Sequence, residues 1–257
     1  MAAPENTFKR RLLAGDTLIG CWLGLADGYA AELMGTAGFD WLVIDGEHAP
    51  NDLRSIREQL TALATSEAEP GVRLPVGETW MVKQALDAGA QTLLIPMVDS
   101  AEQAAELVRA CRYPPNGVRG VGAGLGRATR FSQVTDYIQT ADAEICLLLQ
   151  VESVKGIAAL DDILATDGVD GVFIGPADLS TDMGFAGNAE APEVQETIRD
   201  ALAKIAAADK APGILAVTDT PTQRYIDQGA RFVAVGTDVG ILAGNARRLS
   251  QKWKPGA

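Results

Sequence analysis

One histidine occurs in the chain, His48, and it lies three residues beyond the apolar run Trp41–Asp45. Imidazole is the side chain that most readily exchanges protons near neutral pH, so acid–base chemistry of this kind has one candidate. Barrel enzymes also place their working groups just after a strand, where Gly46 makes a turn here. A lone histidine is often only a surface or capping residue, and the neighbouring polar residues must decide between these interpretations.

Two acidic residues, Glu152 and Asp178, follow apolar runs that contain no other charge. Carboxylates held close together repel each other unless a proton or a cation lies between them. Because no cysteine or second histidine stands nearby, a hard divalent ion such as Mg²⁺ or Mn²⁺ is the natural occupant. The alternative is that each acid caps the helix that follows it. As a matched pair at neighbouring strand ends, the two acids favour a metal site.

Arg73 places a permanent positive charge inside the apolar run Gly71–Pro75. A buried guanidinium needs a negative partner. A substrate carboxylate or a developing enolate would serve, and a structural salt bridge is the alternative. Other residues at predicted strand ends that face the same rim are Trp22, Asp45, Glu47, Gln150 and Pro176.

The lysine positions separate two ways of stabilising a carbanion. A Schiff-base lysine needs an apolar site that depresses its pKa, and no lysine falls within an apolar strand. A metal-stabilised enolate is therefore the better interpretation. The lysines, all in predicted helices or terminal segments, are Lys9, Lys83, Lys155, Lys204, Lys210, Lys252 and Lys254.

Eight short apolar runs recur along the chain, and each is followed by a segment of helical periodicity. Start signals such as the capping box Ser100–Gln103 and the proline after Ala191 mark the helices. Runs this apolar indicate parallel strands covered by helices. Eight such units in 257 residues predict one (β/α)8 barrel domain over residues 1–257. The predicted strands are 18–23, 41–45, 72–74, 92–96, 145–151, 171–175, 213–217 and 232–236.

Composition excludes several classes of protein. With a net charge of −12, the chain lacks the basic character that a nucleic-acid partner requires. No apolar run is long enough to span a membrane, and a charged turn interrupts the N-terminal segment where a signal peptide would need an apolar stretch. We therefore expect no membrane partner and a cytoplasmic location. The three cysteines, Cys21, Cys111 and Cys146, are too widely spaced for a disulfide framework or a zinc cluster and fit buried positions.

Two segments do not follow the repeat. The glycine-rich segment Tyr113–Phe131 contains three arginines but matches neither a dinucleotide-binding nor a Walker motif. We expect a long loop, mobile or at a subunit contact, in preference to a phosphate cradle. The last predicted helix, Val239–Trp253, has an apolar stripe that packs either on the barrel or on a neighbouring subunit. The stripe consists of Ile241, Leu242, Leu249 and Trp253.

Several of these motifs, taken together and in this order, resemble the HpcH/HpaI family of metal-dependent class II pyruvate aldolases. The resemblance covers essentially the whole chain. It implies a (β/α)8 barrel that cleaves 4-hydroxy-2-oxoacids, or hydroxy ketoacids, to pyruvate and an aldehyde and also runs the reverse addition. The motifs are Trp41–His48, Val72–Pro75, Leu94–Met97, Arg119–Gly122, Gln150–Ser153, Phe173–Ser180 and Phe232–Gly236.

The resemblance also implies roles for individual residues. The positions matching Glu152 and Asp178 hold a divalent metal, Mg²⁺, Mn²⁺ or Co²⁺. Arg73 faces the keto oxygen and stabilises the enolate, while His48 acts as the base, paired with Asp45. The pyruvate pocket is lined by Gln150, Gly175, Pro176 and Ala177, and the aldehyde end by Trp22 and Leu215.

Members of this family are typically homohexamers, trimers of dimers in which the C-terminal helix is exchanged between subunits. Asp87 matches an aspartate that reaches a neighbour's site. In this chain Asp87 ends a helix that leads into the fourth strand, so it lies at the wrong end of its own barrel and could act only across an interface.

Other functions remain open at this point. They are a sugar-acid aldolase of the 2-dehydro-3-deoxyglucarate or rhamnonate type, a citramalyl-thioester-type lyase of the same superfamily, and a barrel that only binds ligands. A thioester lyase needs a site for the coenzyme A phosphates, and this acidic chain offers only the arginine loop. A binding barrel gives no reason for Arg73, Glu152 and Asp178 to gather at strand ends.

Overall fold

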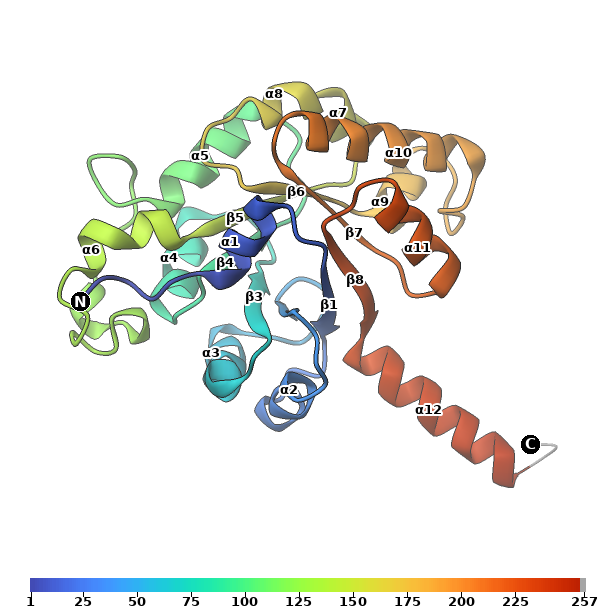
Figure 1. Cartoon of the computed structure of the whole chain (residues 1–257), viewed down its shortest axis with the longest axis horizontal. Coiled ribbons are helices and arrows are strands. Elements are labelled where there is room, and N and C mark those ends of the chain that lie inside the picture. Colours follow the sequence, from blue (N-terminus) through green and yellow to red (C-terminus); the bar gives the residue numbers. More distant parts are fainter. Residues whose placement is uncertain (255–257) are drawn as a thin grey trace.

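Eight parallel strands form a closed barrel in the computed structural model, which describes residues 1–254 (Figure 1). Each strand pairs with its neighbours in sequence, and β1 pairs with β8 to close the ring. The predicted (β/α)8 fold is therefore confirmed. The strands are β1 (Leu18–Leu23), β2 (Trp41–Asp45), β3 (Glu69–Arg73), β4 (Thr92–Ile95), β5 (Cys146–Val151), β6 (Gly171–Ile174), β7 (Ala211–Leu215) and β8 (Phe232–Thr237).

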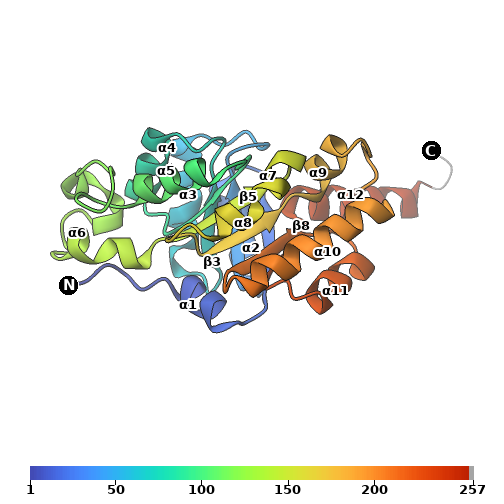
Figure 2. The same ribbon diagram turned by 90° about the horizontal axis from the view of Figure 1, so that it is seen from above.

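Helices connect the strands and cover the barrel; Figure 2 shows the strands enclosed between α3, α4 and α5 on one side and α10 and α11 on the other. The helices are α1 (Thr7–Ala14), α2 (Gly28–Gly35), α3 (Leu53–Ala62), α4 (Thr79–Asp87), α5 (Ala101–Cys111), α6 (Tyr137–Thr140), α7 (Val154–Ala158), α8 (Leu160–Leu164), α9 (Pro176–Asp182), α10 (Pro192–Ala207), α11 (Asp219–Asp227) and α12 (Asp238–Trp253). Short 3₁₀ turns are η1 (Leu63–Thr65), η2 (Ala123–Leu125), η3 (Arg127–Thr129) and η4 (Ala141–Glu144). The expected start signals operate, since Ser100 caps α5 and Pro192 opens α10. No helix within residues 1–254 is long and apolar enough to cross a membrane.

Two strands begin earlier than predicted. β3 starts at Glu69 and β7 at Ala211, so each contains a proline near its beginning, Pro70 and Pro212. Proline normally indicates the end of a central strand because it cannot donate a ladder hydrogen bond. Here pairing with the following strand begins only at the next residue, Gly71 or Gly213, so each proline precedes that ladder.

The interior of the barrel is filled by alternate residues of each strand. In β2, for example, Trp41 and Val43 pack inside the barrel, whereas Leu42 and Ile44 pack against the helices. A β-carbon at Gly20 would overlap the ring of Trp41, so this glycine makes room for an aromatic side chain inside the barrel. The same alternation brings Arg73 and Gln150 to the inner face near the C-terminal ends of their strands.

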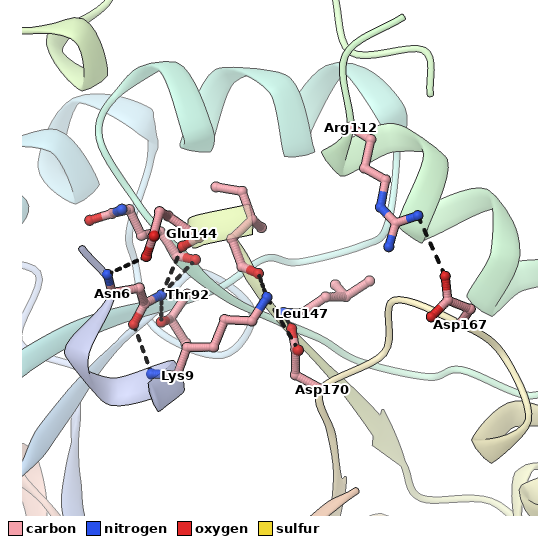
Figure 3. A network of polar contacts seen from close by, with 10 residues as sticks. Asn6, Lys9, Thr92, Arg112, Glu144, Leu147, Asp167 and Asp170 are labelled. Atoms are coloured by element: carbon pink, nitrogen blue, oxygen red, sulfur yellow. Dashed lines mark hydrogen bonds and ion pairs between the residues drawn. The ribbon is translucent and has the colours of Figure 1, made fainter. Parts of the chain in front are cut away.

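Helix α1 closes the opposite, N-terminal end of the barrel. Its Phe8 packs among the interior residues, with ring centroids 6.1 Å from Trp41 and 6.5 Å from Phe232. Lys9 Nζ donates to the carbonyl of Ile145 and lies 3.3 Å from a carboxylate oxygen of Asp170 (Figure 3). This end of the barrel is therefore a structural plug.

Helix α12 leaves the barrel instead of packing on it and projects from the molecule in Figure 1. Asp238 at its start is buried, but its predicted apolar stripe is exposed. The alternative in which this stripe packs on its own barrel is therefore wrong. The exposed residues of the stripe are Ile241, Leu242, Leu249 and Trp253.

Candidate active site

A pocket of about 490 Å³ opens at the C-terminal ends of the strands. Every residue to which the sequence assigned a catalytic, metal-binding or substrate-binding role lines this pocket except Asp87, and Glu47, predicted only to face the same rim, is not among the lining residues. Residues from at least six strand ends meet there, as expected for a barrel enzyme. The lining residues are Trp22, Gly24, Asp45, His48, Ala49, Pro50, Arg73, Gln150, Glu152, Phe173, Gly175, Pro176, Ala177, Asp178, Leu215, Thr237 and Val239.

Arg73 is a cation in the wall of this pocket, and three side chains contact its guanidinium. Its Nε donates to Asp45 Oδ1 at 2.8 Å, and its Nη1 lies 2.6 Å from Glu47 Oε2. The guanidinium carbon stands 4.2 Å from the centroid of the Trp22 ring. The structural salt bridge considered as an alternative is thus present. It fixes the orientation of the guanidinium that faces the pocket, so the two interpretations are compatible.

Glu47 belongs to the same cluster; the sequence placed it at the rim but gave it no particular role. Burial raises the pKa of Glu47, while the charge of Arg73 acts to lower it. Its Oε2 also lies 4.0 Å from Nε2 of His48, so this carboxylate stands between the arginine and the imidazole. The signal that could have identified it is its place two residues after Asp45, on the same turn that leaves β2.

His48 lines the pocket, but 68% of its side chain is exposed. Its backbone N–H points to Asp45 Oδ1 at 3.4 Å. Within residues 1–254, no hydrogen bond joins the imidazole ring itself to Asp45, whose Oδ1 accepts from Arg73 and from the backbone of Glu47. The ring is therefore free to meet a ligand, or a group from another molecule, at the mouth of the pocket.

Glu152 is buried, and its two oxygens have different partners. Oε1 accepts the backbone N–H of Met97 at 3.1 Å, and Oε2 accepts from the side-chain amide of Gln150. Burial raises the pKa of Glu152 to about 7, and the nearby charge of Asp178 adds to this rise. A carboxylate pair that disfavours its own negative charge is suited to a divalent cation.

The helix-cap alternative for these acids is wrong. Ser153 caps α7 through a hydrogen bond from the N–H of Gly156, and Asp178 lies inside the first turn of α9, which has no side-chain cap. Glu152 and Asp178 both line the pocket as oxygen donors and thus fit a hard metal ion. Within residues 1–254, no group of three or more histidine, cysteine or acidic side chains gathers at a metal-binding distance, so any such ion would need additional ligands from substrate or water.

The remaining wall of the pocket is mostly uncharged. Gly175 lies so close to Glu152 that a side chain there would overlap the carboxylate, which explains the glycine before Pro176. In the part of the chain described, Trp22 Nε1 and Gln150 Oε1 are buried without a hydrogen-bond partner. These unpartnered groups suit a polar ligand, because buried donors and acceptors are normally satisfied.

Asp238 positions the first loop of the site, although its sequence position suggested no role. Its two carboxylate oxygens accept the N–H groups of Gly24 and Leu25, at 2.8 and 3.1 Å. This joins the end of β1 to the start of α12. An acidic residue directly after the last apolar strand was the available signal.

Asp87 lies at the end of α4, as predicted, and outside the pocket. Its Oδ1 accepts from Arg119 Nη2 at 2.9 Å. Within residues 1–254, no lysine lines the pocket or falls in a strand, in agreement with the expectation from sequence. The placement of Lys210 in a helix or terminal segment was wrong, because it lies in the turn between α10 and β7.

Known proteins are similar to this chain over almost its full length. Residues 18–244 match the model of the family described as HpcH/HpaI aldolase/citrate lyase. A hydroxypyruvate/pyruvate aldolase of Roseovarius nubinhibens is 61% identical, with 99% of each chain covered. A 4-hydroxy-2-oxo-heptane-1,7-dioate aldolase of Salmonella dublin is 51% identical, with 97% of this chain and 95% of that protein covered. The crystal structure of an HpcH/HpaI aldolase/citrate lyase family protein from Burkholderia cenocepacia superimposes with a TM-score of 0.93 at 42% identity, over 96% of this chain and 98% of that one.

Proposed function

Because the chain belongs to the HpcH/HpaI aldolase/citrate lyase family, we propose that it is a pyruvate aldolase that reversibly cleaves 4-hydroxy-2-oxoacids to pyruvate and an aldehyde. The observation that carries this proposal is the single pocket shared by Arg73, His48, Glu152 and Asp178. It combines a proton acceptor, a fixed cation and a pair of metal-binding oxygens. The names of the two relatives, a hydroxypyruvate/pyruvate aldolase and a 4-hydroxy-2-oxo-heptane-1,7-dioate aldolase, support it.

The reaction requires a base and a stabilised enolate. The base removes the proton of the C4 hydroxyl, the C3–C4 bond breaks, and its electron pair remains on the pyruvate fragment as an enolate. His48 is the group at the mouth of the pocket that takes the proton, with Asp45 beside it. Arg73 stabilises the negative charge as it develops on the keto oxygen, because its guanidinium is already oriented by Asp45 and Glu47.

A divalent metal ion, Mg²⁺, Mn²⁺ or Co²⁺, would be held by Glu152 and Asp178. When bound, the ion would supply a second positive charge against the pyruvate carboxylate and the enolate oxygen. The side-chain amide N–H of Gln150 holds Glu152 in place. Within residues 1–254, Oε1 of Gln150 itself is buried without a hydrogen-bond partner and can accept from a substrate. Gly175, Pro176 and Ala177 would line the part of the pocket that takes pyruvate.

The aldehyde end of the pocket would be shaped by Trp22 and Leu215. Both line the pocket, and Leu215 is only partly buried. Val239 and Thr237, which sequence did not single out, belong to the same rim. This end sets which aldehyde is released or accepted.

We further infer that the active species is a homohexamer, a trimer of dimers with α12 exchanged between subunits. Support comes from the apolar stripe of α12, which is exposed in the single chain. Asp87 would then act at the site of a neighbouring subunit, because it lies outside its own pocket and keeps a quarter of its side chain exposed.

The proposal is tested by supplying a 4-hydroxy-2-oxoacid and measuring pyruvate with a coupled lactate dehydrogenase reaction. We expect pyruvate release at a rate that falls with EDTA and returns with Mg²⁺ or Mn²⁺. The variant Lys204→Ala, changed on α10 outside the pocket, should match the parent enzyme. Absence of pyruvate release with every metal and a panel of such acids would reject the proposal.

A further inference from the structure

The side chain of Arg119 has no exposed surface. Its guanidinium carbon lies 4.5 Å from the centroid of the Tyr113 ring and 5.7 Å from that of Tyr137, while Nη2 donates to Asp87 at 2.9 Å. Nε and Nη1 make no hydrogen bond in the part of the chain described. Burial acts to lower the pKa of Arg119, but Tyr137 and Asp87 outweigh it and the pKa is raised. Arg119 is therefore a fixed cation whose charged partner is Asp87.

The glycine-rich segment 117–126 holds this pair in place by wrapping over the end of α4. A β-carbon at Gly117 would overlap the carbonyl oxygens of Arg109 and Arg112, so the segment can enter this position only through glycine. Arg119 N–H donates to the Arg112 carbonyl at 2.9 Å and ties the segment to the end of α5. The later glycines, Gly122 and Gly126, bring only backbone near Asp87, and a quarter of its side chain stays exposed.

An ion pair of this kind contributes little to the stability of a fold, because removing its charges from water costs free energy. Apolar residues of similar volume often stabilise the fold as well or better. Neither partner lines the pocket of its own barrel. The same segment and the loop after it expose large apolar side chains, as an interface between subunits would. Meanwhile His48 is exposed at its own pocket. The exposed apolar residues are Val121, Leu125 and Phe131.

We propose that Arg119 is a positioning residue for the reaction: held against the rings of Tyr113 and Tyr137, it orients the carboxylate of Asp87 toward the surface. The recipient is the site of a second copy of this chain, where His48 is exposed. This inference rests on the proposed role of Asp87 across the subunit interface. It also gives the glycine-rich arginine segment a function.

Subunit complementation tests the inference. Co-expressed pairs of differently tagged chains are purified as mixed oligomers and assayed for cleavage, with folding checked by circular dichroism and assembly by light scattering. The pairs combine His48→Asn with Asp87→Asn, and His48→Asn with Arg119→Met. Arg119→Lys, which keeps the charge but loses the planar stack, is assayed alone, and Arg112→Lys, at the end of α5 just before the segment, is the matched control.

If Arg119 orients Asp87, Arg119→Met and Arg119→Lys lower kcat about ten- to a hundredfold at an unchanged KM for the oxoacid and an unchanged oligomeric state. The double variant Asp87→Asn/Arg119→Met then loses no more kcat than Asp87→Asn alone. Both mixed pairs regain activity. Failure of the Asp87→Asn pair to regain activity would reject the role of Asp87 across the interface. If that pair complements while Arg119→Lys keeps full kcat in an intact oligomer, the positioning role of Arg119 is wrong.

Discussion

At the scale of single residues, the account depends on Arg73, a cation whose position is fixed by Asp45 and Glu47. Lysine keeps the charge but cannot contact both carboxylates with a planar fork. We expect Arg73→Ala to lower kcat of cleavage by about 10²- to 10³-fold, the usual loss when one charge-stabilising group is removed. Arg73→Lys should keep only part of the kcat that Arg73→Ala loses. Steady-state kinetics measure both, and an Arg73→Ala variant with parental kcat would contradict the assignment.

Loss of His48 should slow aldol cleavage but not a second reaction that forms the same enolate. Cleavage needs removal of the C4 hydroxyl proton, whereas decarboxylation of oxaloacetate reaches the same enolate without that step. We therefore predict that His48→Ala lowers cleavage by about 10²- to 10⁴-fold and leaves most oxaloacetate decarboxylation, followed by loss of oxaloacetate absorbance. Equal losses in both assays would mean that His48 serves enolate formation or folding instead.

The individual site residues were largely predictable because the end of a buried strand is visible in sequence, where a polar residue follows or interrupts an apolar run. Arg73 is the one charge in an apolar run, and Glu152 and Asp178 follow such runs directly. Asp238 was missed, and Glu47 was placed at the rim without a role, because their roles depend on what they contact: the side chain of Arg73 for Glu47 and the backbone of Gly24 for Asp238. Those contacts join segments far apart in sequence, and no local pattern encodes them.

At the scale of elements, α1 stabilises the barrel through Lys9 and Asp170. Burial raises the pKa of Asp170, and Lys9 acts to lower it. Removing the ammonium in Lys9→Met leaves a carboxylate buried without its cation. We expect the free energy of unfolding to fall by about 3 kcal/mol at neutral pH, as for other broken buried pairs.

The sign of the pH dependence follows from the raised pKa. In Lys9→Met the folded chain holds the proton of Asp170 more tightly than the unfolded chain does. The loss of unfolding free energy is therefore complete above the pKa of Asp170 in the folded chain, and it shrinks as the pH falls through that pKa. Urea denaturation between neutral and mildly acidic pH measures this. The double variant with Asp170→Asn should show no such pH dependence; a deficit in Lys9→Met that grows on acidification would refute the explanation.

Element boundaries were predictable where hydrophobic periodicity alone sets them, as in β1 and β2, whose bounds match the prediction. Element boundaries were not predictable where a tertiary contact overrides a local sequence rule. Pro70 and Pro212 lie inside strands because the neighbouring ladder starts one residue later. Arg119 was expected in a loop that is mobile or at a subunit contact, yet its side chain is buried against tyrosines and Asp87.

At the scale of the whole molecule, the proposed assembly depends on the apolar stripe of α12, which is exposed in the single chain. A charge on the stripe should weaken docking on another subunit. We predict that Leu249→Glu yields smaller oligomers by light scattering and lowers activity, whereas Arg247→Glu, on the opposite face and with a larger change of charge, leaves both unaltered. An oligomer unchanged by Leu249→Glu would remove α12 from the interface.

The central claim is that this pocket forms a pyruvate enolate with the help of Arg73 and a divalent ion at Glu152 and Asp178. Exchange of the pyruvate methyl protons for deuterium, followed by NMR without any aldehyde, reports that step alone. We predict exchange with added Mg²⁺, its loss with EDTA and its loss in Arg73→Ala. Exchange that is absent under both metal conditions, or that continues at full rate in Arg73→Ala, would contradict the account.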